Sequence, residues 1–519
     1  MKYLLRFDGV NFDTNIGDTK QLSVQRGGSL LLRKAALDIQ SAISSLKAIS
    51  QGGSVGLFEF EANSQEDAEK TRDDVVHHLR EDKHYGWFTF VVDFTAINDN
   101  DFSKAHETVI ALNRFRQYSQ PTLALPEVNQ DPDIEPCAWD NLRPAAGHDQ
   151  LDAVSRFSKI RYEFGRSQKK RFVNNQTRVD DEQQNPGLAG LNFDYTNDLH
   201  EIADAASSGI KAGNLQGKIA VIYFDGNGFG KVNKGKTASD YTRFDCTILN
   251  KRRQWLRSLL EEYGDDPNFV AQVGKGESMR KVVRLELLLW GGDEIMVVVP
   301  AWCGMEVLQH FYRFHENWEY DDTLLTHAAG LVFCNARTPI AQIKQLAVEL
   351  ADNVKDRYLG KDNGKIDKYT KAANLYDYVA LESIDYPTQS WPEFLAKRYT
   401  SRLAMTRLPS TPLYGRYSDE AQAFRTLLET LPSRQLNKLC LAVTKSTEAY
   451  NLAYTQFKKV VDGAAVFEAQ AKSLFGSQSV HPWYWLHLIE LWDYFVSPEN
   501  DPDNSNNIGH GSVQGDMSL

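Results

Sequence analysis

The sequence predicts an α+β protein with two mixed α/β segments and a helical region that follows them. Strand-like and helix-like stretches alternate up to about residue 120, and the same alternation resumes near residue 218. From about residue 417 onward, leucine-rich and aromatic-rich stretches with helical spacing dominate. These three observations separate the chain into parts that are expected to fold around different cores.

The composition is that of a water-soluble globular protein. The chain has 519 residues, 42% hydrophobic and 24% charged, which suggests three or four domains. Its net charge of −11 argues against a protein that coats nucleic acid or anionic membranes. No apolar run approaches the roughly 20 residues that span a bilayer, and no signal-peptide core precedes Asp8-Gly9. The five scattered cysteines indicate a reducing compartment, so we expect a cytoplasmic protein without membrane contact.

Residues 1–120 predict the first α/β domain. Three strand-like stretches and three helix-like stretches interleave here: Tyr3–Phe7, Ser54–Glu61 and Trp87–Phe94 for strands, and Leu30–Ile49, Glu66–Leu79 and Ser103–Tyr118 for helices. This order predicts one antiparallel sheet covered on one face by helices. Gly27-Gly28-Ser29 is expected to cap the start of the first long helix, and the alternative is that it faces a phosphate.

Residues 121–190 predict a linker with two unlike halves. Prolines interrupt the first half, and a dense basic stretch, Arg156–Arg171, occupies the second. That stretch is either a solvated helical face or a contact for phosphate or RNA, and the sequence leaves both readings open.

Residues 191–385 predict the second α/β domain. Ile219–Phe224 is a short, wholly apolar run typical of a central strand, and it ends at Asp225. A helix is expected over 239–262. Lys281–Trp290, the turn Gly291–Glu294 and the strand 295–299 then predict a hairpin with carboxylates at its tip. A helix over 304–317, a strand over 326–334 and a helix over 340–355 complete the pattern.

Two acidic turns carry the chemistry that the sequence suggests. If the strands that carry them are neighbours, the carboxylates of Asp225, Asp293 and Glu294 converge. Oxygen ligands of this kind suit Mg²⁺ or Mn²⁺, which keep positions open for phosphate oxygens. Glycines around both turns would let backbone and substrate approach closely. Each turn alone is also ordinary turn chemistry, and only the pair favours a metal site.

The same residues resemble a known family. FDGNGFGK (224–231), LLLWGGDEIMVVVP (287–300) and HAAGLVFCNARTPIAQIKQLAVELADNVK (327–355) resemble the palm domain of nucleotide cyclases of the GGDEF type and of polymerases. In particular they resemble the large polymerase-like subunit of type III CRISPR effector complexes and the minimal CRISPR polymerases. CAWDNLRPA (137–145) and SKIRYEFGR (158–166) resemble the linker of that subunit.

The resemblance implies a domain order. Residues 1–120 would form a degenerate palm, and 191–385 a catalytic palm with a GGDE hairpin, both ferredoxin-like. Residues 386–498 would form a helical C-terminal domain. The polar tail 499–519 is expected to be disordered.

The resemblance also implies roles for individual residues. Asp225 and Asp293 would be metal ligands with the backbone of Gly226, and Glu294 would bind metal or contact the attacking hydroxyl. The residues implied in nucleotide binding are Asn227, Gly228, Phe229, Gly291, Gly292 and Lys355. Among these, Lys355 would hold the triphosphate, whereas Phe229 is expected to pack beneath the turn rather than to stack on a base.

Several departures from the family pattern shape these expectations. The CRISPR subunits usually end the hairpin in GGDD, whereas this chain has GGDE, which stays acidic. The zinc cysteines of the linker are reduced to Cys137, with Asp140 where a second could stand, so no zinc is expected. Cyclic-di-GMP synthases usually carry RxxD before the hairpin, and here Leu287 follows Arg284 at that spacing.

The resulting expectation is a Mg²⁺-dependent nucleotidyltransferase that makes a cyclic di- or oligonucleotide from NTPs, with ATP the expected substrate, in antiviral defence. CRISPR effector subunits with guide RNA, or further copies of the chain, are the expected partners. Two alternatives stay open: a catalytically silent palm scaffold that binds RNA and partner subunits, and a cyclic-di-GMP synthase.

Overall fold

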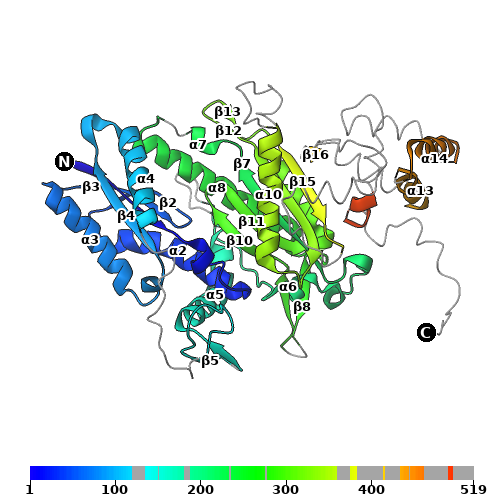
Figure 1. The fold of residues 1–519 in the computed structure, drawn as a ribbon, viewed down its shortest axis with the longest axis horizontal. Helices are drawn as coiled ribbons and strands as arrows, with labels where there is room; N and C mark the ends of the chain where they lie inside the picture. Colours follow the sequence, from blue (N-terminus) through cyan, green and yellow to red (C-terminus); the bar gives the residue numbers. More distant parts are fainter. Residues whose placement is uncertain are drawn as a thin grey trace.

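The computed structural model describes residues 1–119, 135–149, 151–179, 188–232, 235–274, 278–358, 374–382, 413–414, 433–443, 445–460 and 489–494. The predicted tail 499–519 and most of the predicted helical domain 386–498 lie outside these residues. Two helices of that region are described, α13 (Ser433–Val443) and α14 (Thr447–Val460). The described part confirms the α+β class, with two main sheets and helices packed on both (Figure 1).

The first sheet is built from residues 1–119. Its elements in chain order are β1 (Lys2–Gly9), α1 (Phe12–Asn15), α2 (Leu22–Ala42), β2 (Lys47–Gly52), β3 (Val55–Glu61), α3 (Gln65–Glu81), β4 (Phe90–Ala96) and α4 (Phe102–Ser119). The strands pair antiparallel in the order β2-β3-β1-β4. A βαββαβ chain with this order has the split-βαβ, ferredoxin-like arrangement.

Helices cover both faces of the first sheet, which corrects the prediction of one covered face. Along β1, Leu5 and Phe7 point into a core shared with α2 and α3. Leu4 points the other way, into a core with Phe102 and Val109 of α4. Successive side chains of a strand alternate between its faces, and here both faces of β1 are apolar. The sheet therefore needs a helix on each side.

Helix α2 begins earlier than the sequence suggested, so Gly27 and Gly28 lie inside it rather than capping its start. The glycines lie where the linker helix α5 (Arg156–Asn175) packs against α2. A Cβ atom on Gly27 would lie 1.8 Å from the carbonyl oxygen of Arg161, and one on Gly165 would lie 2.0 Å from that of Ser23. The glycines allow a close helix–helix contact that any side chain would block.

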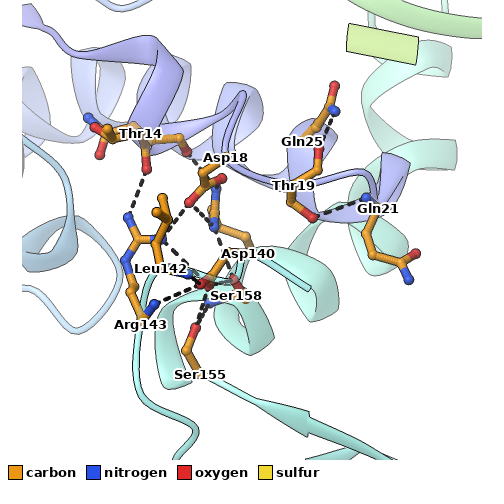
Figure 2. Close-up of polar contacts among 12 residues, drawn as sticks. Thr14, Asp18, Thr19, Gln21, Gln25, Asp140, Leu142, Arg143, Ser155 and Ser158 are labelled. Atoms are coloured by element: carbon orange, nitrogen blue, oxygen red, sulfur yellow. Dashed lines mark hydrogen bonds and ion pairs between the residues drawn. The ribbon is translucent and has the colours of Figure 1, made fainter. Parts of the chain in front are cut away.

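The basic linker stretch forms a partly buried helix. Neither predicted alternative, a solvated helical face or a contact for phosphate or RNA, describes all of it. Arg161 is fully buried and donates two hydrogen bonds to Asp18, at 2.7 and 2.9 Å. Figure 2 shows Asp18 and Asp140 beside Arg143 and the serines at the start of α5. Asp140 accepts hydrogen bonds from Ser155 (2.9 Å) and Ser158 (2.6 Å). Arg161 therefore fixes the linker, with its hairpin β5 (Gly147–Asp149) and β6 (Asp152–Val154), to the first domain.

The second sheet is built mainly from residues 199–380. Its elements are α6 (Leu199–Ala203), β7 (Lys218–Gly226), α7 (Phe229–Val232), α8 (Ala238–Tyr263), β8 (Val270–Val273), β9 (Arg280–Val283), β10 (Glu286–Gly291), β11 (Glu294–Pro300), α9 (Gly304–Phe314), β12 (Glu319–Tyr320), β13 (Thr323–Leu324), β14 (His327–Asn335), α10 (Ile340–Tyr358), β15 (Leu375–Ala380) and β16 (Leu413–Tyr414). The order is β10-β11-β7-β14-β15-β16. The strands β10-β11-β7-β14 correspond in position and chain order to β2-β3-β1-β4 of the first sheet.

The single strand predicted over Lys281–Trp290 is divided into β9 and β10. The break falls at Arg284, whose fully buried guanidinium donates to the carbonyl oxygens of Val270 (3.0 Å) and Ile202 (2.9 Å). A buried charge that must reach these backbone acceptors turns the chain out of the strand. β9 then pairs with β8, and β10 pairs with β11.

Two helical layers enclose the second sheet. Ala220, Ile222 and Phe224 of β7 pack in a core with α8 and α9, whereas Val221 and Tyr223 face a core with α10. β14 and β15 are parallel and are joined through α10, so this helix lies against the face it connects. No helix among the described residues is both long enough and apolar enough to cross a membrane.

Candidate active site

Two acidic turns meet at one edge of the second sheet. Asp225 is the second-last residue of β7, and β11 pairs antiparallel with β7 so that Ile295 lies opposite Phe224. Glu294, the first residue of β11, therefore lies beside Asp225 on the neighbouring strand. The predicted neighbourhood of the two strands is confirmed, and it brings chain-distant carboxylates to one place.

Asp293 lies in the tight turn between β10 and β11. Gly292 precedes it with φ +53°, a left-handed conformation that favours glycine. The buried guanidinium of Arg252 in α8 donates a 2.6 Å hydrogen bond to the carbonyl oxygen of Gly292. Arg252 also stacks over the ring of Trp290, with the guanidinium carbon 5.0 Å from the ring centroid. A charged side chain from another element thus fixes the turn that presents Asp293.

Glu294 is held by a tyrosine on the neighbouring strand. The Tyr223 hydroxyl donates a 2.5 Å hydrogen bond to Oε1 of Glu294. Tyr223 lies two residues before Asp225 on β7, so both side chains project from the same face of the strand. Burial and the nearby carboxylates of Glu294 and Asp225 raise the pKa of Tyr223, which keeps its hydroxyl protonated as a donor.

Lys355 reaches the same place from α10. Its ammonium group forms an ion pair with Asp225 and donates a 3.0 Å hydrogen bond to the carbonyl oxygen of Gly226. α10 covers the face of the sheet toward which Asp225 projects, which explains how a residue near the end of this helix meets the end of β7. The sequence prediction placed Lys355 at this site, and the structure brings the two side chains together.

The electrostatics of the site centre on Asp293. Burial raises the pKa of Asp293 to about 6, and the negative charges of Asp225 and Glu294 add to the shift. Lys355 acts in the opposite direction. Like charges gathered in a partly buried space are costly unless a cation compensates them.

A cavity of about 1290 Å³ opens between the two sheets, in front of the hairpin tip. Asp293 and Glu294 line it, together with Lys231 and Lys236 from the segment after the first acidic turn, whereas Asp225 and Lys355 are not among its lining residues. The opposite wall is the hairpin of β2 and β3. The tips of the two hairpins lie close together here. A Cβ atom on Gly291 would be in ordinary contact with the Cα atom of Gly53, at 3.4 Å.

The other predicted nucleotide-binding residues surround the first turn. The Asn227 amide nitrogen Nδ2 donates to Oγ1 of Thr326 at 3.0 Å, and its Oδ1 atom is buried without a hydrogen-bond partner. Gly228 has φ +74°. Phe229 is buried, and its ring lies directly beneath Gly226, where a Cβ atom would be 2.6 Å away. Phe229 therefore packs under the turn, as the sequence suggested.

Three further residues shape the site and were missed in the sequence. In the sequence, Tyr223 is only part of an apolar strand. It lies two residues before Asp225, however, and residues two apart on a strand point to the same face. Arg252 lies in an amphipathic helix, where nothing distinguishes it from a surface arginine. Asp245 of α8 lines the cavity and accepts a 3.1 Å hydrogen bond from Ser50 of the first sheet. The last two contacts join distant segments and leave no local signal.

The chemistry of the donor set suits a hard cation, although the side chains do not form a complete cage. Within the described residues, no group of three His, Cys, Asp or Glu side chains is arranged to hold a metal ion. Mg²⁺ is commonly bound through one or two carboxylates, with water and substrate phosphates as its other ligands. Asp225 and Asp293 are carboxylates of this kind, and Asp293 faces the cavity.

Comparison with known proteins gives similarity only to solved structures. No family model and no curated protein matches the chain. The chain is similar to a Csm1-Csm4 cassette in complex with cA4, at 14% identity and a TM-score of 0.47, over 95% of this chain and 69% of that one. It is similar to an apo Csm1-Csm4 cassette at 14% identity and a TM-score of 0.48, over 94% and 70%. Csm1 in T. onnurineus matches at 14% identity and a TM-score of 0.45, over 94% and 69%.

Proposed function

We propose that the protein is a Mg²⁺-dependent nucleotidyltransferase that joins NTPs into a cyclic di- or oligonucleotide. One observation carries the proposal: two paired strands bring Asp225 beside Glu294 and the hairpin tip, where Asp293 and Glu294 line a cavity of about 1290 Å³. This volume exceeds the roughly 300–1,000 Å³ of a pocket for one small ligand, so it suits two nucleotides side by side.

Asp225 and Asp293 would hold the metal. Burial, and secondarily the charges of Asp225 and Glu294, raise the pKa of Asp293 to about 6, and a bound cation would offset both effects. A bound Mg²⁺ ion would promote ionisation of the attacking hydroxyl and neutralise charge on the leaving pyrophosphate. We assign no larger ligand set, because Mg²⁺ takes its remaining ligands from water and phosphates.

The other residues of the chain position and neutralise the substrates. Tyr223 fixes Glu294 where its carboxylate can accept the proton of a ribose hydroxyl. Lys355 would exchange its contact with Asp225 for the triphosphate, and Lys231 and Lys236 would add positive charge along the cavity. The hydroxyl oxygen bonds to the α-phosphorus of the second nucleotide, the bond from that phosphorus to the bridging oxygen breaks, and pyrophosphate leaves.

The sequence resemblance suggests the biological setting of this reaction. It implies ATP as substrate, antiviral defence, and either CRISPR effector subunits with guide RNA or further copies of the chain as partners. These partners can be tested by co-purification, because guide RNA and backbone subunits would accompany an effector subunit and would be missing from a stand-alone synthase.

The direct test is pyrophosphate release with Mg²⁺ and each labelled NTP, followed by identification of the product. We expect turnover of ATP, and a loss of at least about 10³-fold in Asp225→Asn and Asp293→Asn, because each removes a charge that stabilises the transition state. Asp74→Asn on the exposed face of α3 is the matched control and should be unchanged.

Other outcomes of this assay would overturn the proposal. No turnover of any NTP, with or without added RNA, would favour the silent scaffold. Consumption of GTP alone with formation of cyclic di-GMP would favour the alternative synthase. Thermal melting of each variant separates a lost reaction from a lost fold, since Asn keeps the size of Asp.

A further inference from the structure

A second cavity adjoins the catalytic one and is lined by an unusual density of positive charge. We call it the arginine pocket; it measures about 640 Å³ and lies between α2, α5 and α8. Its cationic lining consists of Arg33, Lys34, Arg171, Arg178 and Arg253. None of the described residues that line it is acidic. The chain as a whole has a net charge of −11, so this local excess of positive charge is unusual.

Most of this charge is not neutralised within the described protein. Lys34 forms an ion pair with Asp38. By contrast, the ion pairs found among the described residues include none of Arg33, Arg171 or Arg178. Arg171 and Arg178 are exposed, so water solvates them. The uncompensated charge is therefore concentrated on one hollow surface.

Arg33 provides the sharpest sign of a ligand. Its Nη2 atom donates a 3.3 Å hydrogen bond to Oε1 of Gln176, and its guanidinium lies over the ring of Phe172. Its Nη1 atom is buried and has no hydrogen-bond partner. Burial and the charge of Arg253 lower the pKa of Arg33 to about 10. A buried donor without an acceptor is costly, and an anion in the pocket would satisfy it.

The lining also indicates the class of anion. Guanidinium groups bind phosphate through paired N–H donors, and arginine is favoured where phosphate is recognised. Phe164 and Phe172 contribute half-buried aromatic rings to the same pocket. Arginines combined with aromatic rings bind the phosphates and bases of nucleotides, and the volume lies in the range for one small ligand.

We propose that the arginine pocket binds the phosphate groups of a nucleotide, at a site that adjoins the catalytic cavity but contains none of its carboxylates. The phosphates could belong to a free nucleoside triphosphate or to a short oligonucleotide, which present the same groups to the arginines. Binding at this site does not require the catalytic carboxylates, so the proposal stands or falls independently of the proposed reaction.

The pocket is connected to the catalytic hairpin through one amide. Oε1 of Gln176 accepts both from Arg33 and from Nε1 of Trp290, at 2.9 Å, and Trp290 directly precedes Gly291 in the hairpin. Arg33 lines both cavities. A phosphate that engages Arg33 would weaken its bond to Gln176 and change the support of Trp290. An effect on turnover through this route rests on the proposed function, whereas binding does not.

The test measures binding by calorimetry in EDTA, where Mg²⁺-dependent turnover is absent. The probes are ATP, hexa-adenylate and inorganic triphosphate. The test variant is Arg171→Glu/Arg178→Glu, and the matched control is Lys70→Glu/Arg114→Glu, which makes the same charge change at exposed positions of α3 and α4. All four side chains are exposed, so both variants should fold, and thermal melting checks this.

We expect the test variant to lose one binding site, or at least 10-fold in affinity, for ATP or for hexa-adenylate, while the control changes less than 2-fold. The probe that is affected identifies the source of the phosphates; inorganic triphosphate shows whether the phosphates suffice. Equal effects in both variants, or no binding of any probe, would overturn the proposal. Asp293→Asn should bind these probes at the pocket like the wild type, which separates this test from failure of the proposed reaction.

Discussion

At the residue scale, His327 shows how burial sets the protonation of a group beside the active site. It lies opposite Gly226 in the pairing of β14 with β7, and it is surrounded by the rings of Phe229, Phe311 and Trp318. Burial lowers its pKa to about 3, and the charge of Lys355 acts in the same direction. The folded protein therefore keeps this histidine neutral.

This shift predicts a stability that falls with falling pH. Between about pH 6.5 and 3, the unfolded chain protonates His327 and the folded protein does not, so the unfolded state binds more protons. Each such group costs about 1.4 kcal/mol of the free energy of unfolding per pH unit across that range. In His327→Phe, we expect the decline between pH 6 and 4 to be shallower by about that amount.

Urea denaturation of the wild type and the variant at several pH values measures this difference. The neighbouring His315 stays in place in both proteins; burial is the main cause that lowers its pKa and the charge of His327 is secondary, so it contributes nearly equally to the two slopes. Parallel slopes would show that His327 is protonated in the folded state as easily as in the unfolded one.

At the scale of elements, a buried ion cluster joins three segments at the start of the catalytic hairpin. Glu286, the first residue of β10, is almost fully buried. It accepts hydrogen bonds from Arg26 of α2 at 2.6 and 2.5 Å and from Lys169 of α5 at 2.7 Å. Burial alone would raise the pKa of Glu286, but these two cations lower it, so the carboxylate stays ionised.

Removing the carboxylate charge should be costly. In Glu286→Gln we expect a loss of about 3 kcal/mol in the free energy of unfolding, because two buried cations lose their counter-charge. The control is Glu59→Gln, which breaks the surface pair between Glu59 and Lys2 and should cost less than about 1 kcal/mol. Urea denaturation distinguishes the two; similar losses would mean that the cluster contributes no more than a surface ion pair.

The elements also show what the sequence could and could not predict. The strand before Asp225 and the helix that ends near Lys355 were predicted because apolar periodicity and turn residues mark them locally. The convergence of Asp225 with Asp293 followed from carboxylates at the ends of two buried strands. Gly27, by contrast, looks like a helix cap in the sequence. Its place inside a helix is explained only by its contact with α5, which leaves no local signal.

At the scale of the whole molecule, the two sheets are tied together rather than linked by a free tether. Arg26 and the linker residue Lys169 both reach Glu286 of the second sheet. Ser50 of β2 donates to Asp245 of α8, and Thr242 of the same helix donates a 2.9 Å hydrogen bond to the carbonyl oxygen of Ile49. These contacts cross between the sheets, so the sheets should open as one cooperative unit.

Native-state hydrogen exchange tests this cooperativity. Glu286→Gln should lower the protection of the central strands β1 and β7 by the same free energy, although the substitution lies in neither strand. Loss confined to β7 and its neighbours would show instead that the two sheets unfold separately. The surface control Glu59→Gln should lower the protection of both strands only by the small loss expected for its surface ion pair.

The glycine contact between the two hairpin tips has an evolutionary consequence. Gly53 and Gly291 come from different sheets. A Cβ atom on Gly291 would make ordinary contact with the Cα atom of Gly53 at 3.4 Å, whereas one on Gly53 would meet nothing within 4 Å but would be strained by the φ of +58°. Among homologues, position 291 should therefore accept alanine but not a bulky residue, and position 53 should keep glycine or asparagine for its backbone conformation.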